Sequence, residues 1–424
     1  MGAEVEALPG ATAPAGKARG RRGKRVNVRT PDVMARVQAE VEAHYRSELV
    51  DQIRKSGGNL TIGNTTIRLA LRFGFCYGVE RAIDLAYATC RVFPDRRVFL
   101  IGEIIHNPEV NRQLEEMGIQ RLEWRGLTEE YENLGEDDVV IVPAFGAPTQ
   151  FMAKIEAQGC SVIDTTCGDV VNVWRRVRTY ARQGVTSVIH GKARHEETLA
   201  TASRALGDAG DGHYLVVLTL ADTDYLCDYI RRGGDRADFL QRFEGGYSDG
   251  FDPDRHLQRV GVANQTTMLK SETEDLQRRI RRAVIDRDGE TEGRENFQVF
   301  DTICGATQER QDALFDLLSV PMDLLLVVGG YNSSNTSHLV EMGTGRLPSF
   351  FIRGASCLKS LSEVMHFDLE EGREVSGYAE KLMGGGPVVV GITAGASCPS
   401  NLIEETIFRV FELRGIPREQ VVVR

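Results

Sequence analysis

Short apolar runs alternate with segments of helical periodicity along most of the chain. Each run is bounded by glycine, proline or polar residues, which is typical of buried strands. The runs that predict strands are 65–71, 98–101, 139–142, 161–164, 187–189, 215–218, 260–263, 297–300, 324–328, 349–352 and 388–392. Helical spacing covers 79–93, 109–117, 170–183, 308–318 and 401–414. This alternation predicts an α/β protein built from parallel sheets.

Polar motifs follow most of the predicted strands directly. They occupy 73–76, 103–108, 143–146, 164–167, 190–197, 264–267, 301–304, 329–336 and 393–397. In parallel sheets, ligands bind beyond the carboxyl ends of the strands. We therefore expect these motifs to build one shared site.

Three segments stand outside this alternation. Residues 1–29 are rich in glycine, alanine, proline and basic residues and predict a disordered basic tail. Residues 30–64 predict a helical arm, which starts at Thr30-Pro31 and ends at Gly57-Gly58. This arm is expected to pack on the main body or on a second subunit. Residues 231–256 are rich in glycine, acids and arginine and predict a surface insertion.

Length and composition narrow the class of protein. The chain has 424 residues, which suggests two or three lobes, and its net charge of −10 argues against broad nucleic-acid binding. No apolar run reaches the roughly 18 residues of a membrane span, and no apolar secretory segment opens the chain. Eight cysteines without close pairs indicate a reducing compartment rather than a disulfide framework.

Three cysteines share one setting. Cys76, Cys167 and Cys304 each stand where a predicted strand ends and a helix begins. A helix N-terminus offers N–H groups and a positive dipole end, which favour a thiolate. Three thiolates from separate junctions suit an iron–sulfur cluster with one open iron. Zinc sites and redox dithiols usually need closely paired cysteines, which are absent here. The other cysteines are interpreted as buried apolar residues: Cys90, Cys160, Cys227, Cys357 and Cys398.

Two loops and several side chains suit a phosphate. Gly-Gly-Tyr-Asn-Ser-Ser-Asn-Thr (329–336) and Thr-Ala-Gly-Ala-Ser (393–397) are rich in donors but lack the Gly-Lys-Ser/Thr of a P-loop. His106 and His195 lie in loops at strand ends and are candidates to contact a diphosphate. Glu196-Glu197 offers a carboxyl group for proton delivery, and Thr266-Thr267 offers hydroxyls. Each motif alone also fits an ordinary capped turn.

Together the motifs resemble one enzyme family. The matching segments, in order, are GFCYGVERA (74–82), IHNPEVN (105–111), DTTC (164–167), HEET (195–198), NQTT (264–267), DTICGATQERQ (301–311), SSNT (333–336) and TAGAS (393–397). The chain resembles the 4-hydroxy-3-methylbut-2-enyl diphosphate reductases over residues 65–412. The long arm, Pro-Ala-Phe-Gly and His-Glu-Glu-Thr resemble the plant and cyanobacterial branch.

The resemblance implies a trefoil of three small parallel-sheet α/β lobes around a central iron–sulfur cluster. The expected lobes span 65–165, 166–300 (with the 231–256 insertion) and 301–424, after the tail and the arm. The family implies one 4Fe-4S cluster per chain, with Cys76, Cys167 and Cys304 as its three protein ligands. Its fourth iron would take the substrate's hydroxyl oxygen.

The remaining site residues are also carried over by motif. The diphosphate would be held by His106, His195, Ser333, Ser334, Asn335 and Ser397. Thr266 would contact the substrate beside the cluster, and Glu197 would deliver the proton. Phe145 departs from the better-known branch, which has a histidine there, so the role of this position is open.

The implied reaction is the last step of the methylerythritol phosphate route to isoprenoids. It is the reductive dehydroxylation of (E)-4-hydroxy-3-methylbut-2-enyl diphosphate to isopentenyl and dimethylallyl diphosphate. The implied electron donor is ferredoxin or flavodoxin, no nucleic acid or membrane partner is expected, and a homodimer is an open arrangement. A bacterial cytoplasm is the expected location, with a plastid as the second choice. The alternatives are an iron–sulfur hydro-lyase acting on another phosphorylated substrate and a non-catalytic binding protein.

Overall fold

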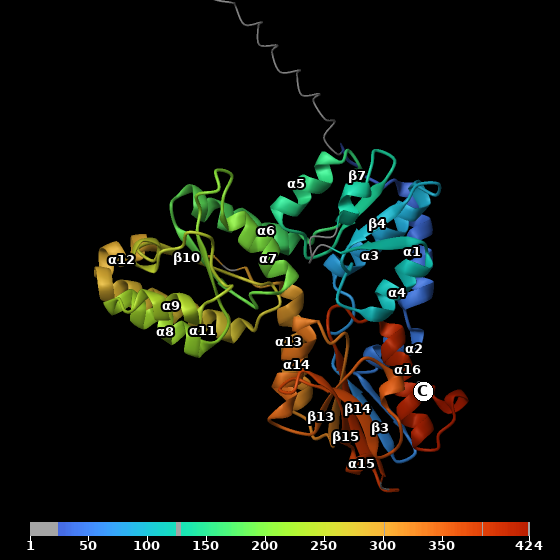
Figure 1. The fold of residues 1–424 in the computed structure, drawn as a ribbon. Coiled ribbons are helices and arrows are strands. Elements are labelled where there is room, and N and C mark those ends of the chain that lie inside the picture. The colour runs from blue at the N-terminus through green and yellow to red at the C-terminus, as the bar shows by residue number, and fades with distance from the viewer. Residues whose placement is uncertain (1–23, 124–128, 301, 384, 423–424) are drawn as a thin grey trace, which may run out of the picture.

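The computed structural model describes residues 24–123, 129–300, 302–383 and 385–422. Three α/β lobes meet at a common centre (Figure 1). The predicted α/β class is confirmed, because each lobe has its own sheet and the strands within each sheet are mostly parallel. Most of the predicted 1–29 tail lies outside the described residues.

The first sheet has the order β1-β7-β6-β4-β5, and all of its pairs are parallel. Its central strand Val139–Val142 is buried along its whole length, as the apolar run requires. Helices α1, α3 and α4 pack on one face and α5 on the other. The elements are β1 (Lys24–Arg25), α1 (Pro31–Tyr45), α3 (Tyr77–Val92), β4 (Val98–Ile101), α4 (Pro108–Glu116), β5 (Ile119–Leu122), the 3-10 turn Glu129–Asn133, β6 (Val139–Val142), α5 (Thr149–Ala157) and β7 (Ser161–Asp164).

The second sheet has the order β11-β10-β8-β9 and is also parallel. Helix α6 packs on one face, and α8, α9 and α11 cover the other (Figure 1). The elements are α6 (Gly168–Arg182), β8 (Thr186–His190), α7 (Glu196–Ala205), β9 (Tyr214–Val217), α8 (Leu220–Arg232), α9 (Arg236–Arg242), α10 (Pro253–His256), β10 (Val260–Asn264), α11 (Lys270–Asp288), α12 (Glu290–Asn296) and β11 (Phe297–Val299).

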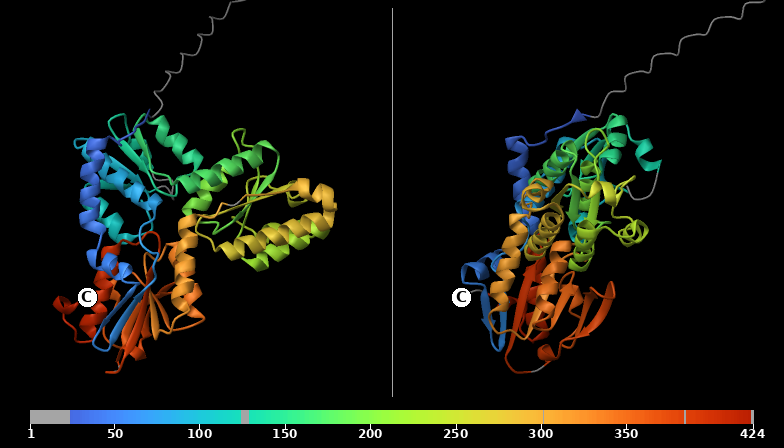
Figure 2. Two further views of the ribbon diagram at one scale, coloured as in Figure 1. Left: turned by 180° about the vertical axis from the view of Figure 1, so that it is seen from behind. Right: turned by 90° about the vertical axis from the view of Figure 1, so that its left-hand side faces the viewer.

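The third sheet has the order β13-β12-β16-β3-β2 and a separate hairpin, β14–β15. Helix α13 stands at the junction of the lobes in Figure 1 and in both views of Figure 2. The elements are α2 (Glu48–Lys55), β2 (Asn59–Ile62), β3 (Thr65–Leu69), α13 (Gly305–Leu318), β12 (Leu324–Val328), α14 (Ser334–Thr344), β13 (Ser349–Ile352), the 3-10 turn Ala355–Cys357, β14 (Glu363–Asp368), β15 (Arg373–Tyr378), α15 (Glu380–Met383), β16 (Val388–Ala394), α16 (Ser400–Leu413) and the 3-10 turn Arg418–Gln420.

The expected start of the first lobe at residue 65 is wrong. Strand β3 pairs in parallel with β16, with Thr65 opposite Val388, and does not join the first sheet. Strand β2 then pairs antiparallel with β3 at the edge. The apolar side chains of β3 are buried among those of the C-terminal strands, so the third lobe contains both an early and a late part of the chain.

The N-terminal arm differs from the single helix that its spacing predicts. The helix stops at Tyr45, and Ser47 starts a second one by accepting a hydrogen bond from the Val50 N–H at 3.1 Å. Ser47 also donates to Glu404 of α16, which ties the break to the third lobe. Part of the predicted disordered tail is also ordered, because β1 pairs with β7.

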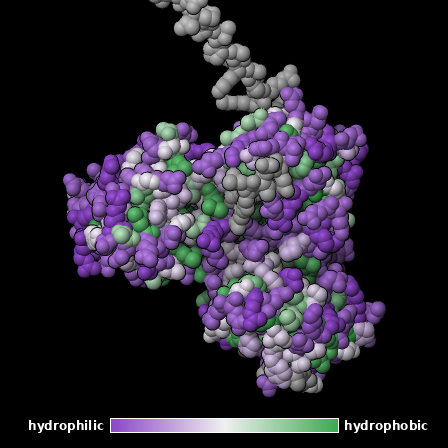
Figure 3. All heavy atoms as spheres, in the orientation of Figure 1, coloured by the Kyte–Doolittle hydropathy of each residue, from purple (hydrophilic) through white to green (hydrophobic). Residues whose placement is uncertain are grey.

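The 231–256 segment is not only a surface insertion. Three of its aromatic residues, Phe239, Phe243 and Phe251, are buried in the core of the second lobe. The acidic and basic residues that dominate its composition face outward around this apolar anchor, for example Asp235 and Arg236. The outer surface seen in Figure 3 is mostly hydrophilic, with hydrophobic residues at scattered positions. None of the described helices is long and apolar enough to cross a membrane.

Candidate active site

The three predicted cysteines come together. Cys76, Cys167 and Cys304 are the N-cap residues of α3, α6 and α13, and all three line one central pocket. The first turn of α3 fits closely against them, because a Cβ added at Gly78 would lie 2.6 Å from the Cys167 Sγ and 3.9 Å from the Cys76 Sγ. Glycine is therefore required where α3 approaches two thiols.

The thiols are not activated by the helix ends alone. Burial raises the pKa of the Cys304 thiol to about 12, against a smaller lowering by the Thr307 N–H. Burial likewise raises the pKa of Cys167, although the backbone N–H groups of Asp169 and Val170 oppose this. The N–H groups at these helix starts therefore favour the thiolates as expected, but for Cys167 and Cys304 the effect of burial is larger. Thiols of this kind ionise when they bind a metal.

Arg310 is a site residue without an assigned role in the sequence analysis. It lies on α13, is 5% exposed, and donates a 2.6 Å hydrogen bond to the carbonyl of Gly74, in the segment between β3 and α3. Burial lowers its pKa, and the nearby Cys76 and Cys304 thiols act in the opposite direction. The buried guanidinium near Cys76 and Cys304 would compensate the negative charge of these thiols if they ionised.

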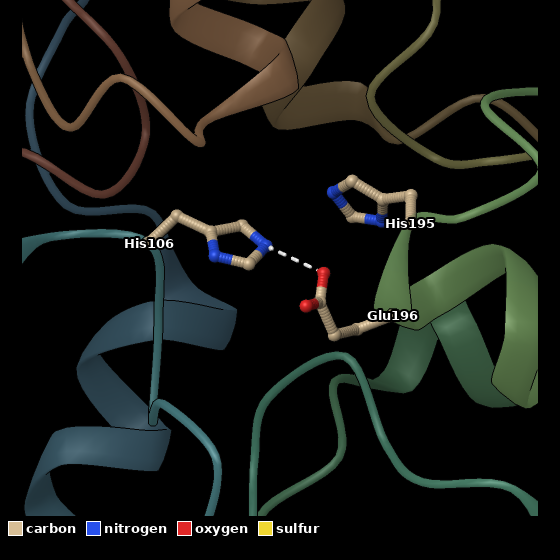
Figure 4. Close-up of side chains that lie close together, drawn as sticks. All are labelled: His106, His195 and Glu196. Carbon is tan, nitrogen blue, oxygen red and sulfur yellow. Dashed lines mark ion pairs between the residues drawn. The ribbon is translucent and has the colours of Figure 1, made fainter. Parts of the chain in front are cut away.

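His106 is held on three sides. Its Nε2 lies 3.6 Å from Glu196 (Figure 4). Its Nδ1 lies 3.1 Å from Glu103, and its ring stacks on Phe145 at a centroid distance of 4.7 Å. The His195 ring meets it edge-on at 5.1 Å. Phe145 therefore orients His106 by stacking, a contact that needs no hydrogen-bonding side chain.

Phe145 is itself placed by the following glycine. Gly146 has a φ of +78°, and a Cβ there would overlap the Trp174 ring of α6. The Arg204 guanidinium covers that ring at 3.3 Å from its centroid. The Pro-Ala-Phe-Gly loop of the first lobe thus packs tightly against the second.

His195, Glu197 and Thr266 form a second group. The Glu197 N–H donates to the His195 Nδ1 at 3.2 Å, which leaves Nε2 as the donor nitrogen of the neutral ring. The Glu197 carboxylate accepts hydrogen bonds from the Thr266 N–H at 2.6 Å and the Thr266 hydroxyl at 3.0 Å. Burial raises the pKa of Glu197 to about 7, and these hydrogen bonds oppose the rise. A carboxyl group with this pKa is suited to proton transfer near neutral pH.

The predicted phosphate loops supply unused donors. Ser333 caps α14, and the next residues, Ser334 and Asn335, are buried on its first turn. The Ser334 Oγ, the Asn335 Nδ2 and the His106 Nε2 find no hydrogen-bond partner among the described residues. The Ser397 hydroxyl lies against them and donates to the His106 carbonyl at 3.2 Å. Buried polar groups of this kind are normally satisfied by a ligand or water.

A cation is a second candidate ligand for part of this wall. One nitrogen of His106, one of His195 and one carboxylate oxygen of Glu196 lie within 4.8 Å of one another (Figure 4). Two imidazoles and a carboxylate are common ligands of zinc and of ferrous iron. The donors of Ser334 and Asn335 instead fit an anion, which the N-terminus of α14 also favours.

The pocket thus has two chemically different walls. The three cysteines form one, and the other carries His106, His195, Glu197, Thr266, Ser333, Ser334, Asn335 and Ser397. No lysine or arginine is among the described residues that line it. Fold and site together define a three-lobed α/β protein in which three thiols and a set of buried polar side chains line one pocket.

Comparison with known proteins identifies the family. The sequence model of the LytB protein family matches residues 67–411. The chain belongs to this family, because the match covers far more than half of it. The expected resemblance is thereby confirmed.

Several cyanobacterial proteins are similar over most of their length. The chain is 49% identical to the 4-hydroxy-3-methylbut-2-enyl diphosphate reductase of Gloeobacter violaceus over 387 residues, which is 90% of this chain and 91% of that protein. It is 45% identical to the protein of that name from Thermosynechococcus vestitus, with coverages of 90% and 92%.

A solved structure shares the fold. The E-1-hydroxy-2-methyl-but-2-enyl-4-diphosphate reductase from Plasmodium falciparum is 20% identical and matches with a TM-score of 0.59. The match covers 83% of this chain and 90% of that one.

Proposed function

We propose that this chain reduces (E)-4-hydroxy-3-methylbut-2-enyl diphosphate to isopentenyl diphosphate and dimethylallyl diphosphate. One observation carries the proposal: the three cysteines line the same pocket as the buried Ser334 and Asn335, whose side chains have donors without partners among the described residues. Membership of the LytB family and the names of the cyanobacterial relatives support it. The reaction consumes two electrons and two protons and releases the hydroxyl group as water.

We propose a 4Fe-4S cluster as the cofactor, one per chain, held by Cys76, Cys167 and Cys304. Three converging thiols, the close approach of Gly78 and the buried Arg310 fit such a group. When bound, a cluster with three protein ligands supplies single electrons and one iron that is open to substrate oxygen.

The opposite wall would bind the diphosphate. Ser334 and Asn335 offer donors, and His106, His195, Ser333 and Ser397 stand beside them. Without lysine or arginine, recognition rests on neutral donors, the start of α14 and the two histidines. Burial of the substrate here excludes water from the reacting carbon.

Glu197 would deliver the proton. Its carboxyl group lines the pocket and is held by Thr266, so its position does not depend on the substrate. Thr266 has a second role in this proposal, because its hydroxyl also faces the pocket and contacts the substrate. The raised pKa of Glu197 keeps a fraction of the carboxyl protonated at neutral pH.

An anaerobic turnover assay tests the function. Protein reconstituted with iron and sulfide should form both products when ferredoxin or flavodoxin, our proposed electron donors, is supplied in reduced form. Omission of the donor should stop turnover. Turnover that persists without any donor would favour an iron–sulfur hydro-lyase instead.

Replacing Asn335 with alanine tests the diphosphate wall. We expect KM to rise about 10- to 100-fold with a smaller change in kcat, because a hydrogen bond to a charged group is worth about 1.5–3 kcal/mol. Ser337→Ala is the matched control, since Ser337 lies on the same helix but bonds the Ser333 carbonyl and does not line the pocket. An unchanged KM for Asn335→Ala would remove Asn335 from the binding site.

Two further expectations stay predictions. A homodimer would be tested by size-exclusion chromatography with light scattering. A cytoplasmic location would be tested by fractionation of the source cells.

A further inference from the structure

We propose that Tyr331 is a positioning residue for the diphosphate wall, because it fastens the turn before α14 to the hairpin β14–β15 of the third lobe. The inference rests on the proposed function, in which residues 333–335 bind the diphosphate. Tyr331 is not among the described residues that line the pocket, whereas all three residues of this segment are. The effect of Tyr331 on the substrate therefore passes through the backbone that it holds in place.

A tight turn connects β12 to α14. The Ser333 N–H closes this turn by donating to the Gly330 carbonyl at 2.9 Å, which places Tyr331 and Asn332 at its corner. Ser333 is also the N-cap of α14, so the unpartnered donors of the next two residues lie on the first turn of this helix. A shift of the corner therefore moves the helix cap and the buried donors together.

The first lobe holds the backbone of this turn. A Cβ added at Gly330 would overlap the carbonyl oxygen of His106 and lie 3.3 Å from Pro108. The same carbonyl accepts a hydrogen bond from the Ser397 hydroxyl at 3.2 Å. The turn therefore packs directly against the segment that carries His106, and a displacement of the turn disturbs that part of the diphosphate wall as well.

The third lobe holds the side chain at the corner. The Tyr331 ring stacks on Phe367 of β14 at a centroid distance of 4.7 Å and meets Phe351 of β13 edge-on at 5.0 Å. The Tyr331 hydroxyl donates to the Oε1 of Glu374 on β15 at 2.8 Å, and Arg353 donates to the same oxygen at 2.9 Å. The Arg353 guanidinium also lies over the tyrosine ring, 5.3 Å from its centroid. Residues of three strands thus fix this one side chain.

The hydrogen bond to Glu374 gives the hairpin a hold on the site. Burial raises the pKa of Tyr331, and Cys357 and Glu374 raise it further, so the hydroxyl keeps its proton and remains a donor. A hydrogen bond to a carboxylate is stronger than one between neutral groups. The hairpin lies against β13 (Figure 1), and none of its described residues lines the pocket. Its contribution to binding is therefore made through the turn.

The test measures binding and turnover on the same reconstituted, full-length protein. Anaerobic calorimetry gives the Kd for inorganic pyrophosphate, and the turnover assay gives KM and kcat. We expect Tyr331→Ala to raise Kd and KM about tenfold, and Tyr331→Phe, which keeps the ring, about threefold, with kcat within about twofold of the parent. The matched control is Tyr378→Ala, because Tyr378 is an exposed tyrosine of the same hairpin and should leave all three constants unchanged.

A double-mutant cycle tests the contact itself. Glu374→Ala should raise Kd about as much as Tyr331→Phe, and the double variant should raise it no further, because both changes remove one hydrogen bond. Additive effects in the cycle, or a lower free energy of unfolding in Tyr331→Ala with an unchanged Kd, would overturn the positioning role. A parent protein that binds pyrophosphate in this Tyr331-dependent way but shows no turnover would instead reject the proposed function. The two failures are therefore distinguishable.

Discussion

Replacing Cys167 with alanine is expected to lower turnover by at least about 100-fold, because a cluster site with three protein ligands is left with two. Cys167 lines the pocket at the start of α6, and its Sγ lies so near Gly78 of α3 that a Cβ there would meet it at 2.6 Å. The iron content of the anaerobically reconstituted protein should fall together with the activity. Both quantities are measured on the same sample, iron by a colorimetric assay and turnover with methyl viologen as the donor.

The control for this prediction is Cys90→Ala. Cys90 lies on α3, half-buried and away from the pocket, and it should keep both iron and activity. When both proteins lack the cluster, the free energy of unfolding of Cys167→Ala should be within about 1 kcal/mol of that of the parent, because the half-buried sulfur contributes little packing. Full activity in Cys167→Ala would reject the proposed cofactor site.

Replacing Glu197 with glutamine is expected to lower kcat by about 100- to 1,000-fold, the usual contribution of a positioned proton donor. The amide keeps the size of the side chain and still accepts a hydrogen bond from Thr266, but it has no proton to give. Single-turnover measurements under anaerobic conditions separate this step from product release. Glu196→Gln is the neighbouring control, and it should act through His106 on KM rather than on kcat.

The pH dependence follows from the pKa of Glu197, which burial raises from 4.5 to about 7. Only the protonated carboxyl group of Glu197 can deliver the proton, so the kcat of the parent protein should fall as pH rises through about 7. The kcat of Glu197→Gln should not show this fall. The raised pKa of Glu197 also makes the free energy of unfolding depend on pH, because the folded state binds this proton more tightly than the unfolded state does. It contributes about 3 kcal/mol below pH 4.5, and this contribution is lost as pH rises through about 7. A pH-independent kcat in the parent across this range would contradict the role of Glu197.

Much of the site could be predicted because it depends on local sequence. Residues 161–164 form β7 as predicted, since a short apolar run in a parallel sheet ends where a polar residue follows it. Cys167 then falls at the helix start by spacing alone. The gathering of Cys76, Cys167 and Cys304 follows from the rule that ligands meet the carboxyl ends of parallel strands.

The rest depends on contacts between distant segments. The apolar run of β3 predicts a strand, and its position before α3 suggested that it starts the first lobe. Its partner β16 lies over 300 residues away and cannot be inferred from periodicity. The thiol pKa values depend on burial, which the helix-end argument ignores. Arg310 looks like an ordinary surface residue of a helix until the fold places it beside the Gly74 carbonyl.

The pairing of β3 with β16 also has a consequence for how the protein is made. The ribosome releases β3 early, but the strand that flanks it in parallel is among the last to emerge. Until then, the sheet of the third lobe, beside which α13 and Cys304 lie, is incomplete. Insertion of the metal group is therefore expected only after translation is complete, and nascent chains that stall before residue 388 should remain apoprotein.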